Sequence, residues 1–312
     1  MVEIKFSVLT VEKEEIARKE LVRLFGKIDN LEINVTMDFD GTVTEYLQKR
    51  GVNEQYQSTR AGGEVVASKV LNYPSNGQLG TCLAINANAR MFSNWNDEFN
   101  LERMHILCHE MGHIIINQNR YRQIGHERFF SSPNSTDEWM DELANDIIDE
   151  YIVERNAVQT LLKEFHPDPS PYFGERLKGL VEILANHLQS FKTFIAEKTE
   201  SYRRGTILPD DFWGSIYLRT RDTLNAFSLA AAIIDTIPSC SSLLEPIEIN
   251  ETYKELFERA WTEMEKLLAQ FFQENSCEVN KRQASEDFRN LFQLFGIEFH
   301  DVDGRMAISI KQ

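Results

Sequence analysis

Three residues able to bind a metal ion and move a proton lie together in His109-Glu110-Met111-Gly112-His113, an H-E-x-x-H sequence. In a helix, residues four apart lie on one face, so the imidazoles of His109 and His113 can point at a single ion. Glu110 lies about 100° further round the helix, where its carboxylate can take a proton from a water on that ion. The spacing therefore predicts a Zn²⁺ site with Glu110 as general base.

The motif supplies two zinc ligands, and the third must come from elsewhere. His105 lies one turn before His109. The imidazoles at positions 105 and 113 would be about 12 Å apart along the helix axis, so we expect His105 to support a ligand residue or to be structural, and not to bind the ion. Ile116 and Asn119 occupy the places where the longer metzincin signature needs glycine and a third histidine, which excludes that class.

A second helix, expected from Trp139 to Phe165, carries acids that could complete the site. Its apolar residues mark one buried face: Leu143, Ile147, Tyr151, Val158, Leu161, Leu162 and Phe165. Glu154 falls on this face and Glu150 at its edge, whereas Glu142 and Asp149 point away. A buried carboxylate is costly unless it is paired or bound to a metal. We therefore assign Glu150 as the third ligand and Glu154 as the residue that orients a ligand histidine.

Two other assignments of the third ligand stay open. Glu142 forms a Glu-x-x-x-Asp spacing with Asp146, and Asp141 is its neighbour. Either acid could reach the metal if the second helix packed in another register.

These helices resemble a known family. HEMGH followed by DEYIVERNA, residues 149–157, looks like the gluzincin-type zinc peptidases, and most like the ImmA/IrrE-like cytoplasmic metallopeptidases. In those proteins a strand ending in Asn, comparable to CLAIN at 82–86, precedes the H-E-x-x-H helix. The resemblance covers roughly residues 60 to 160. It implies a zincin-like catalytic domain with zinc on His109, His113 and Glu150 and catalysis by Glu110. This chain departs from the pattern with Glu154 in place of Asp and Val153 in place of a small residue.

A rival motif begins at Asp38, in Asp-Phe-Asp-Gly-Thr after a strand-like run. It resembles the first motif of haloacid-dehalogenase-type phosphatases, in which Asp38 would be the nucleophile and Asp40 the acid and base. The other elements of such an enzyme are not evident, since Asp210-Asp211 follows a proline at an expected helix start. Asp40-Gly41 between two alternating runs instead predicts a β-hairpin.

Composition narrows the class of protein. The 312 residues are 42% apolar, enough for a large core, and carry a formal charge of −16, which argues against nucleic-acid and membrane binding. The apolar runs are far shorter than the ~20 residues of a membrane span, and glutamates occupy the N-terminus where a signal peptide would be basic. We expect a cytoplasmic protein. Four dispersed cysteines predict mostly buried thiols, with neither a disulfide framework nor a thiolate zinc site: Cys82, Cys108, Cys240 and Cys277.

Periodicity and breaker residues predict the order of elements. The first part should hold strands at Glu3–Leu9, Leu31–Phe39, Glu64–Leu71 and Thr81–Asn86, and a helix at Glu12–Phe25. The H-E-x-x-H helix should start at Asn96 or Asp97 and end near Ile116, before a polar loop at 117–137 that is functional or mobile. Further helices are expected at 139–165, 175–200, 209–236, 251–274 and 281–295, and a final hairpin at Asp303-Gly304. The fold class is α+β, with a zincin-like domain at 1–165 and a helical domain at 166–312.

These observations together predict a zinc-dependent peptidase acting on a protein or peptide substrate. From the family resemblance we expect regulatory cleavage of a repressor or a similar partner. The alternative is an interaction or sensor module in which zinc is structural, or a protein whose activity is latent until a partner opens the loop 117–137.

Overall fold

The computed structural model describes residues 2–7, 9–52, 55–57, 66–93, 95, 100–274 and 282–311. The chain forms two compact units, one made of 1–131 with 156–169 and the other of 132–155 with 170–312. One boundary between them therefore falls inside a continuous helix, α5 (Thr136–Glu164). The division into domains at 165/166 stays a prediction.

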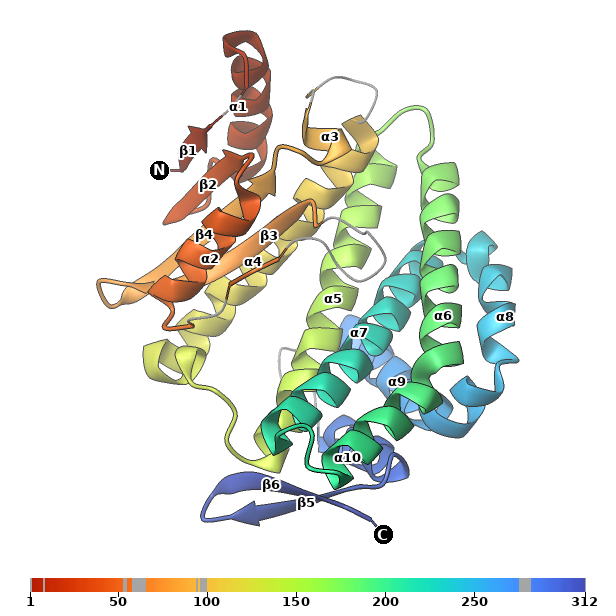
Figure 1. The fold of residues 1–312 in the computed structure, drawn as a ribbon. Helices are drawn as coiled ribbons and strands as arrows, with labels where there is room; N and C mark the ends of the chain where they lie inside the picture. Colours follow the sequence, from red (N-terminus) through yellow and green to blue (C-terminus); the bar gives the residue numbers. More distant parts are fainter. Residues whose placement is uncertain are drawn as a thin grey trace. The chain divides into compact units, whose positions relative to one another are not determined.

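A four-stranded mixed sheet forms the centre of the first unit (Figure 1). Its strands lie in the order β1 (Glu3–Phe6), β2 (Leu31–Thr36), β4 (Gln78–Asn86) and β3 (Ser68–Ser75). The first three are parallel, and β3 runs antiparallel to β4 at the edge. β4 is buried from its second residue to its last, as a strand covered on both faces must be. The predicted strands are confirmed with shifted ends.

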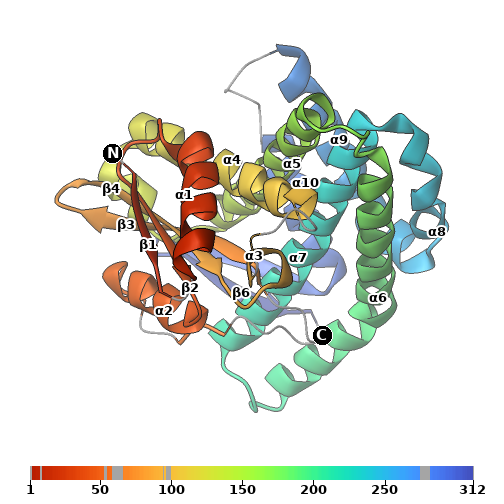
Figure 2. The same cartoon turned by 90° about the horizontal axis from the view of Figure 1, so that it is seen from above.

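Helices cover both faces of this sheet (Figure 2). α1 (Val11–Phe25) and α4 (Asn100–Phe130) pack on one face, where Leu21 and Leu107 join Leu83 of β4. α2 (Phe39–Lys49) packs on the other face, where Val43 joins Cys82. Because side chains alternate along a strand, Cys82 and Leu83 point to opposite faces. A short helix, α3 (Arg90–Ser93), follows β4.

The predicted hairpin at Asp40-Gly41 is wrong, because this segment begins α2. Asp38 caps the helix, and its Oδ1 accepts a hydrogen bond from the Gly41 backbone N–H at 3.1 Å. A β-carbon at Gly41 would lie 2.3 Å from Asp38 Oδ2. The glycine is therefore needed for the close approach of the cap and not for a reverse turn.

The predicted loop at 117–137 is also mostly wrong. α4 continues past Ile116 to the end of its 31 residues, with one break at Gly125, where φ is 80° and ψ is 172°. The Tyr121 hydroxyl donates to the carbonyl of Gly77 in the β3–β4 turn at 3.1 Å. The polar composition resembles that of a loop, but such a sequence also forms a partly exposed helix when tertiary contacts anchor it.

The second unit is largely helical. Its elements besides α5 are α6 (Ser170–Arg203), α7 (Pro209–Thr236), η2 (Pro238–Leu244), α8 (Glu245–Glu248), η3 (Tyr253–Phe257), α9 (Glu258–Glu274), α10 (Arg282–Leu294), β5 (Ile297–Val302) and β6 (Arg305–Ile310). Its buried core includes Leu184 of α6, Phe227 of α7 and Phe288 of α10. The final hairpin turns at Asp303-Gly304, as predicted, through two residues with positive φ. In the part of the chain that the structure describes, helices apolar and long enough to span a bilayer are absent.

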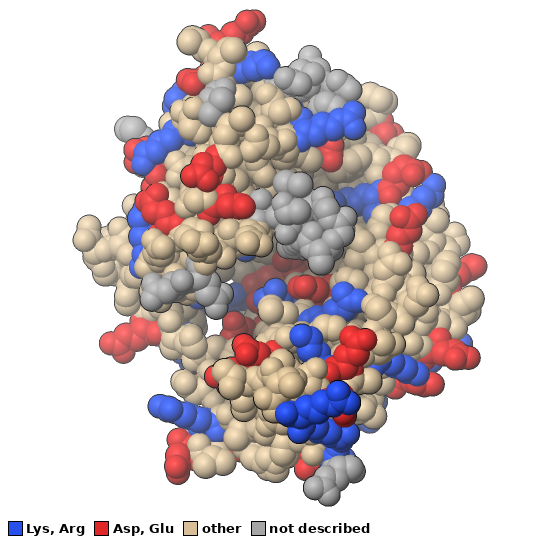
Figure 3. All heavy atoms as spheres, viewed as in Figure 1, with Lys and Arg blue, Asp and Glu red and all other residues tan. Residues whose placement is uncertain are grey.

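Three of the four cysteines lie among the described residues. Cys82 and Cys108 are buried free thiols, and burial raises their pKa values to about 12 and about 11. Cys240 is a half-buried free thiol, and Cys277 lies outside the described residues. Acidic and basic side chains are interspersed over the face drawn in Figure 3.

Candidate metal centre

α4 holds the H-E-x-x-H residues at the boundary between core and solvent. Leu107 and Ile114 are fully buried against the sheet, whereas His109, Glu110 and His113 are half-buried. This division follows from helical periodicity, which separates the apolar positions from the chemical ones. The start expected for this helix lies outside the described residues.

The two motif histidines face each other. Their Nε2 atoms are 3.1 Å apart, and the ring planes meet at 71°. Two ligand atoms of one tetrahedral zinc, each about 2.05 Å from the metal, would lie about 3.3 Å apart. The pair therefore has the separation that a shared ion requires.

Glu150 completes a group that could hold a metal ion. One ligand atom from each of His109, His113 and Glu150 lies within 4.8 Å of the others, and all three residues are half-buried. No second group of this kind is found among the described residues. His105 is outside the group and is 1% exposed, which agrees with a structural role.

No family model matches this chain, and searches of the curated proteins and the solved structures find no match either. The metal centre is therefore argued from this chain's own residues. Two imidazoles and a carboxylate form a donor set that suits Zn²⁺ and other divalent transition metals, and such a set leaves a coordination position for water.

Glu110 has a partner that sequence reasoning missed. Ser68, the first residue of β3, donates a hydrogen bond from Oγ to Glu110 Oε1 at 2.7 Å. Ser68 is 8% exposed. The two residues are 42 positions apart, and they meet because α4 packs beside the edge strand β3. Only the packing of these elements could have revealed the contact.

Glu154 is fully buried, as predicted, and its ion pair was not foreseen. Arg176 of α6 donates from Nε to Glu154 Oε1 at 3.0 Å. Burial opposes the charge on Arg176, but the negative charges of Glu154 and Glu150 outweigh it and raise the pKa of the guanidinium. Arg176 thus stabilises the acidic face of α5 that carries Glu150. The assignment of Glu154 to orient a ligand histidine stays a prediction.

The competing third ligands lie elsewhere. Asp141 is exposed and accepts a hydrogen bond from Ser285 Oγ at 2.5 Å. Glu142 is also exposed. Of the three candidates, Glu150 is the one whose ligand atom belongs to the metal-binding group.

Three further residues whose side chains could take part in chemistry have structural contacts. Asp38 caps α2, which accounts for its carboxylate without phosphoryl transfer. Tyr151 is 1% exposed, as its place in the apolar stripe predicted, and donates to Asp235. His126 is half-buried, with Nδ1 at 3.2 Å from the Tyr121 hydroxyl.

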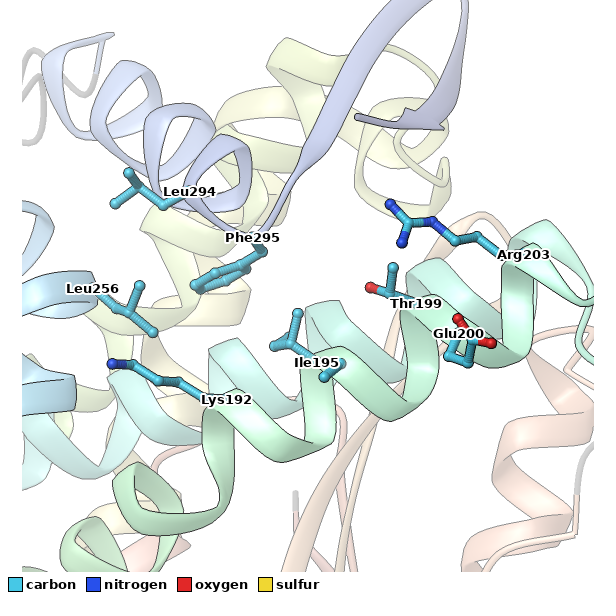
Figure 4. Close-up of a pocket in the computed structure, with 9 residues that line it drawn as sticks. Lys192, Ile195, Thr199, Glu200, Arg203, Leu256, Leu294 and Phe295 are labelled. Atoms are coloured by element: carbon cyan, nitrogen blue, oxygen red, sulfur yellow. The ribbon is translucent and has the colours of Figure 1, made fainter. Parts of the chain in front are cut away.

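A pocket lies along α6 in the second unit (Figure 4). Its volume is about 630 Å³, and its lining includes Ile195 and Phe295, with Lys192 and Arg203. Both cations are engaged, since Lys192 pairs with Glu255 and Arg203 donates to a backbone carbonyl near the C-terminus. The residues that line it include no histidine or cysteine, so it is a separate feature from the metal centre.

Proposed function

We propose that this protein is a zinc metallopeptidase that hydrolyses a peptide bond in a protein or peptide substrate. The observation that carries the proposal is the group of His109, His113 and Glu150, with Glu110 next to the first ligand in an H-E-x-x-H helix. From the residues that resemble ImmA/IrrE-like metallopeptidases, we carry forward the expectation that the substrate is a regulatory protein.

The proposed ligands are the two imidazoles and the Glu150 carboxylate. Zinc held there would lower the pKa of a bound water and polarise the scissile carbonyl. The carboxylate of Glu150 would offset part of the metal charge.

Glu110 supplies the proton transfers in this proposal. The Ser68 hydroxyl engages Oε1 and leaves Oε2 to accept the proton of the attacking water. As the carbon–nitrogen bond breaks, Glu110 returns that proton to the leaving amine nitrogen. The carboxylate is then regenerated, and the products are a free carboxylate and a free amine.

The test compares metal content with turnover in the full chain. Wild type should bind one zinc and cleave members of a quenched fluorogenic peptide library. Glu110→Gln should keep its zinc and lose turnover by at least about 10³-fold, because the general base is gone. His113→Ala and Glu150→Ala should lose or weaken zinc binding, with the exposed Glu142→Gln as matched control.

Two results would contradict the proposal. If folded wild type takes up no metal on reconstitution, the proposed metal centre is wrong. If Glu110→Gln cleaves at the wild-type rate, the proposed role of Glu110 as general base is wrong. Zinc binding without any cleavage would instead favour a zinc-stabilised interaction module.

A further inference from the structure

The pocket along α6 has an apolar wall built by three elements of the second unit (Figure 4). Ile195 comes from α6, Leu256 from η3, and Leu294 and Phe295 from the end of α10. Ile195 and Phe295 are each 8% exposed, whereas Leu294 is 62% exposed, so the wall extends from the core to solvent. The volume of about 630 Å³ lies within the range of small-molecule sites, ~300–1,000 Å³. The pocket can therefore take an organic ligand.

Cationic side chains stand at the two ends of this wall. Lys192 and Arg203 are eleven residues apart on α6, which is about 16 Å along the helix axis. Lys192 forms an ion pair with Glu255. Glu200, an acid that lines the pocket, accepts a hydrogen bond from Arg204 Nε at 2.7 Å. The charges of Lys192 and Glu200 are therefore offset by these partners.

The charge of Arg203 is not offset in the same way. Its Nη2 atom donates a hydrogen bond to the Lys311 carbonyl oxygen at 2.8 Å, and a carbonyl carries no net charge. Among the residues that the structure describes, Arg203 has no carboxylate partner. A guanidinium has five N–H donors in one plane, so most of them remain for a ligand.

Thr199 adds a hydroxyl at the same end of the pocket. It lies one helical turn before Arg203, and the two side chains share a face of α6 (Figure 4). Thr199 is half-buried, and its hydroxyl makes no hydrogen bond with a described residue. One end of the apolar wall thus combines a positive charge with N–H and O–H donors.

This combination selects an apolar anion. A carboxylate accepts hydrogen bonds and matches the planar fork of a guanidinium, whereas an ammonium group would be repelled by Arg203 and would offer only donors. The apolar wall suits a hydrocarbon chain, because each buried CH₂ group favours binding. The wall follows α6 for about three turns, so an extended chain fits better than a compact ring.

We propose that this pocket binds a medium-chain fatty acid. Its carboxylate contacts Arg203 and Thr199. Its chain lies along Ile195 and Phe295 towards Lys192. The described lining residues all belong to the second unit, and none of them is a proposed metal ligand. The site therefore goes beyond the proposed peptidase function and does not depend on it.

Calorimetry on the full chain tests the proposed site without zinc or turnover. The ligands are sodium decanoate, sodium octanoate and the neutral 1-octanol, each below the concentration at which it aggregates. We expect one decanoate per chain, bound about tenfold more tightly than octanoate because two more CH₂ groups are buried. Octanoate should bind at least about tenfold more tightly than 1-octanol, which lacks the charge.

Three variants locate the ligand, and the thermal midpoint of each one checks its folding. Arg203→Gln removes the charge from an exposed side chain, so decanoate should bind at least about tenfold more weakly and 1-octanol as before. Lys178→Gln is the matched control, because it removes an exposed cation of α6 outside the pocket, and its decanoate affinity should equal that of wild type. Ala196→Trp places a large ring in the pocket from an exposed position, so all three ligands should bind at least about tenfold more weakly.

Three results would overturn the fatty-acid site. Equal binding of octanoate and 1-octanol would show that the carboxylate is not recognised. Wild-type decanoate affinity in folded Arg203→Gln or in folded Ala196→Trp would show that the ligand lies elsewhere. Several decanoate molecules bound per chain with equal affinity would show general adsorption to the surface.

Discussion

Replacing Ser68 by alanine removes the hydroxyl that donates to Glu110 Oε1 at 2.7 Å. β3 holds the serine and α4 holds the glutamate, so this bond fixes the carboxylate between two rigid elements. In the alanine variant, the carboxylate can turn about its terminal side-chain bond, whose torsional preference is broad. The proposed base is then less often in the orientation that accepts a proton.

The geometry of the Ser68–Glu110 hydrogen bond indicates how much kcat should fall in Ser68→Ala. A hydroxyl–carboxylate bond of this length is charge-assisted, and hydrogen bonds to charged groups contribute about 1.5–3 kcal/mol. Because Glu110 is half-buried, water can replace part of the lost bond, which favours the lower limit. About 1.4 kcal/mol in the barrier is a tenfold change in rate. We therefore expect kcat to fall about tenfold, with KM within about twofold of wild type and zinc content unchanged.

The assay is steady-state hydrolysis of one peptide chosen from the library, with zinc content and thermal midpoint measured on the same samples. Ser68→Thr keeps the hydroxyl and suits a strand, so it should restore kcat to within about threefold of wild type. Ser75→Ala, at the other end of β3, is the matched control and should leave kcat unchanged.

Two outcomes would refute this reasoning. In the first, the loss in Ser68→Ala appears wholly in KM or in zinc content. In the second, Ser68→Thr is folded and metal-loaded but as slow as Ser68→Ala. A role in positioning Glu110 is compatible with neither.

Two predictions concern stability and can be checked by urea unfolding. Burial, helped by Arg219, lowers the pKa of His187 from 6.5 to about 4. Stability from this group is thus full above pH 6.5 and lost as pH falls through 4. Allowing for the partial exposure of His187, the free energy of unfolding of wild type should fall by about 2 kcal/mol more than that of His187→Gln between about pH 7 and pH 4. Equal losses in the two proteins would contradict the prediction. Gly41→Ala should lower the free energy of unfolding by about 1–2 kcal/mol, because the added β-carbon displaces the Asp38 cap. In Gly174→Ala the added β-carbon has nothing within 4 Å, so the free energy of unfolding should stay the same or rise. A larger loss of stability in Gly174→Ala than in Gly41→Ala would contradict this prediction.

Local periodicity predicted most of the fold. The helix expected at 12–25 runs over 11–25, and the final hairpin turns where Asp303-Gly304 indicated. These segments carry their own signal, because apolar spacing and turn residues act over a few positions. The prediction of local structure failed where one short sequence is compatible with two different structures. Asp40-Gly41 is typical of a hairpin turn and equally suits the first turn of a capped helix.

Burial was harder to predict than secondary structure. Asp149 was expected to point away from the buried face of α5, but it is 9% exposed. Val153, outside the apolar stripe, is fully buried as well. The buried face of α5 is therefore wider than the apolar stripe from which it was predicted. Charged side chains such as Asp149 can also be buried there when they find partners.

The sequence by itself determined His109, Glu110 and His113 as one chemical unit, because four-residue spacing within a single helix needs no other part of the chain. Only the tertiary structure decided that Glu150, and not Asp141 or Glu142, has a ligand atom near both histidines. It alone brought Ser68 to Glu110 and Arg176 to Glu154. Those contacts join segments far apart in the chain, and strand pairing and helix packing set them together, which the spacing of residues in one segment does not encode.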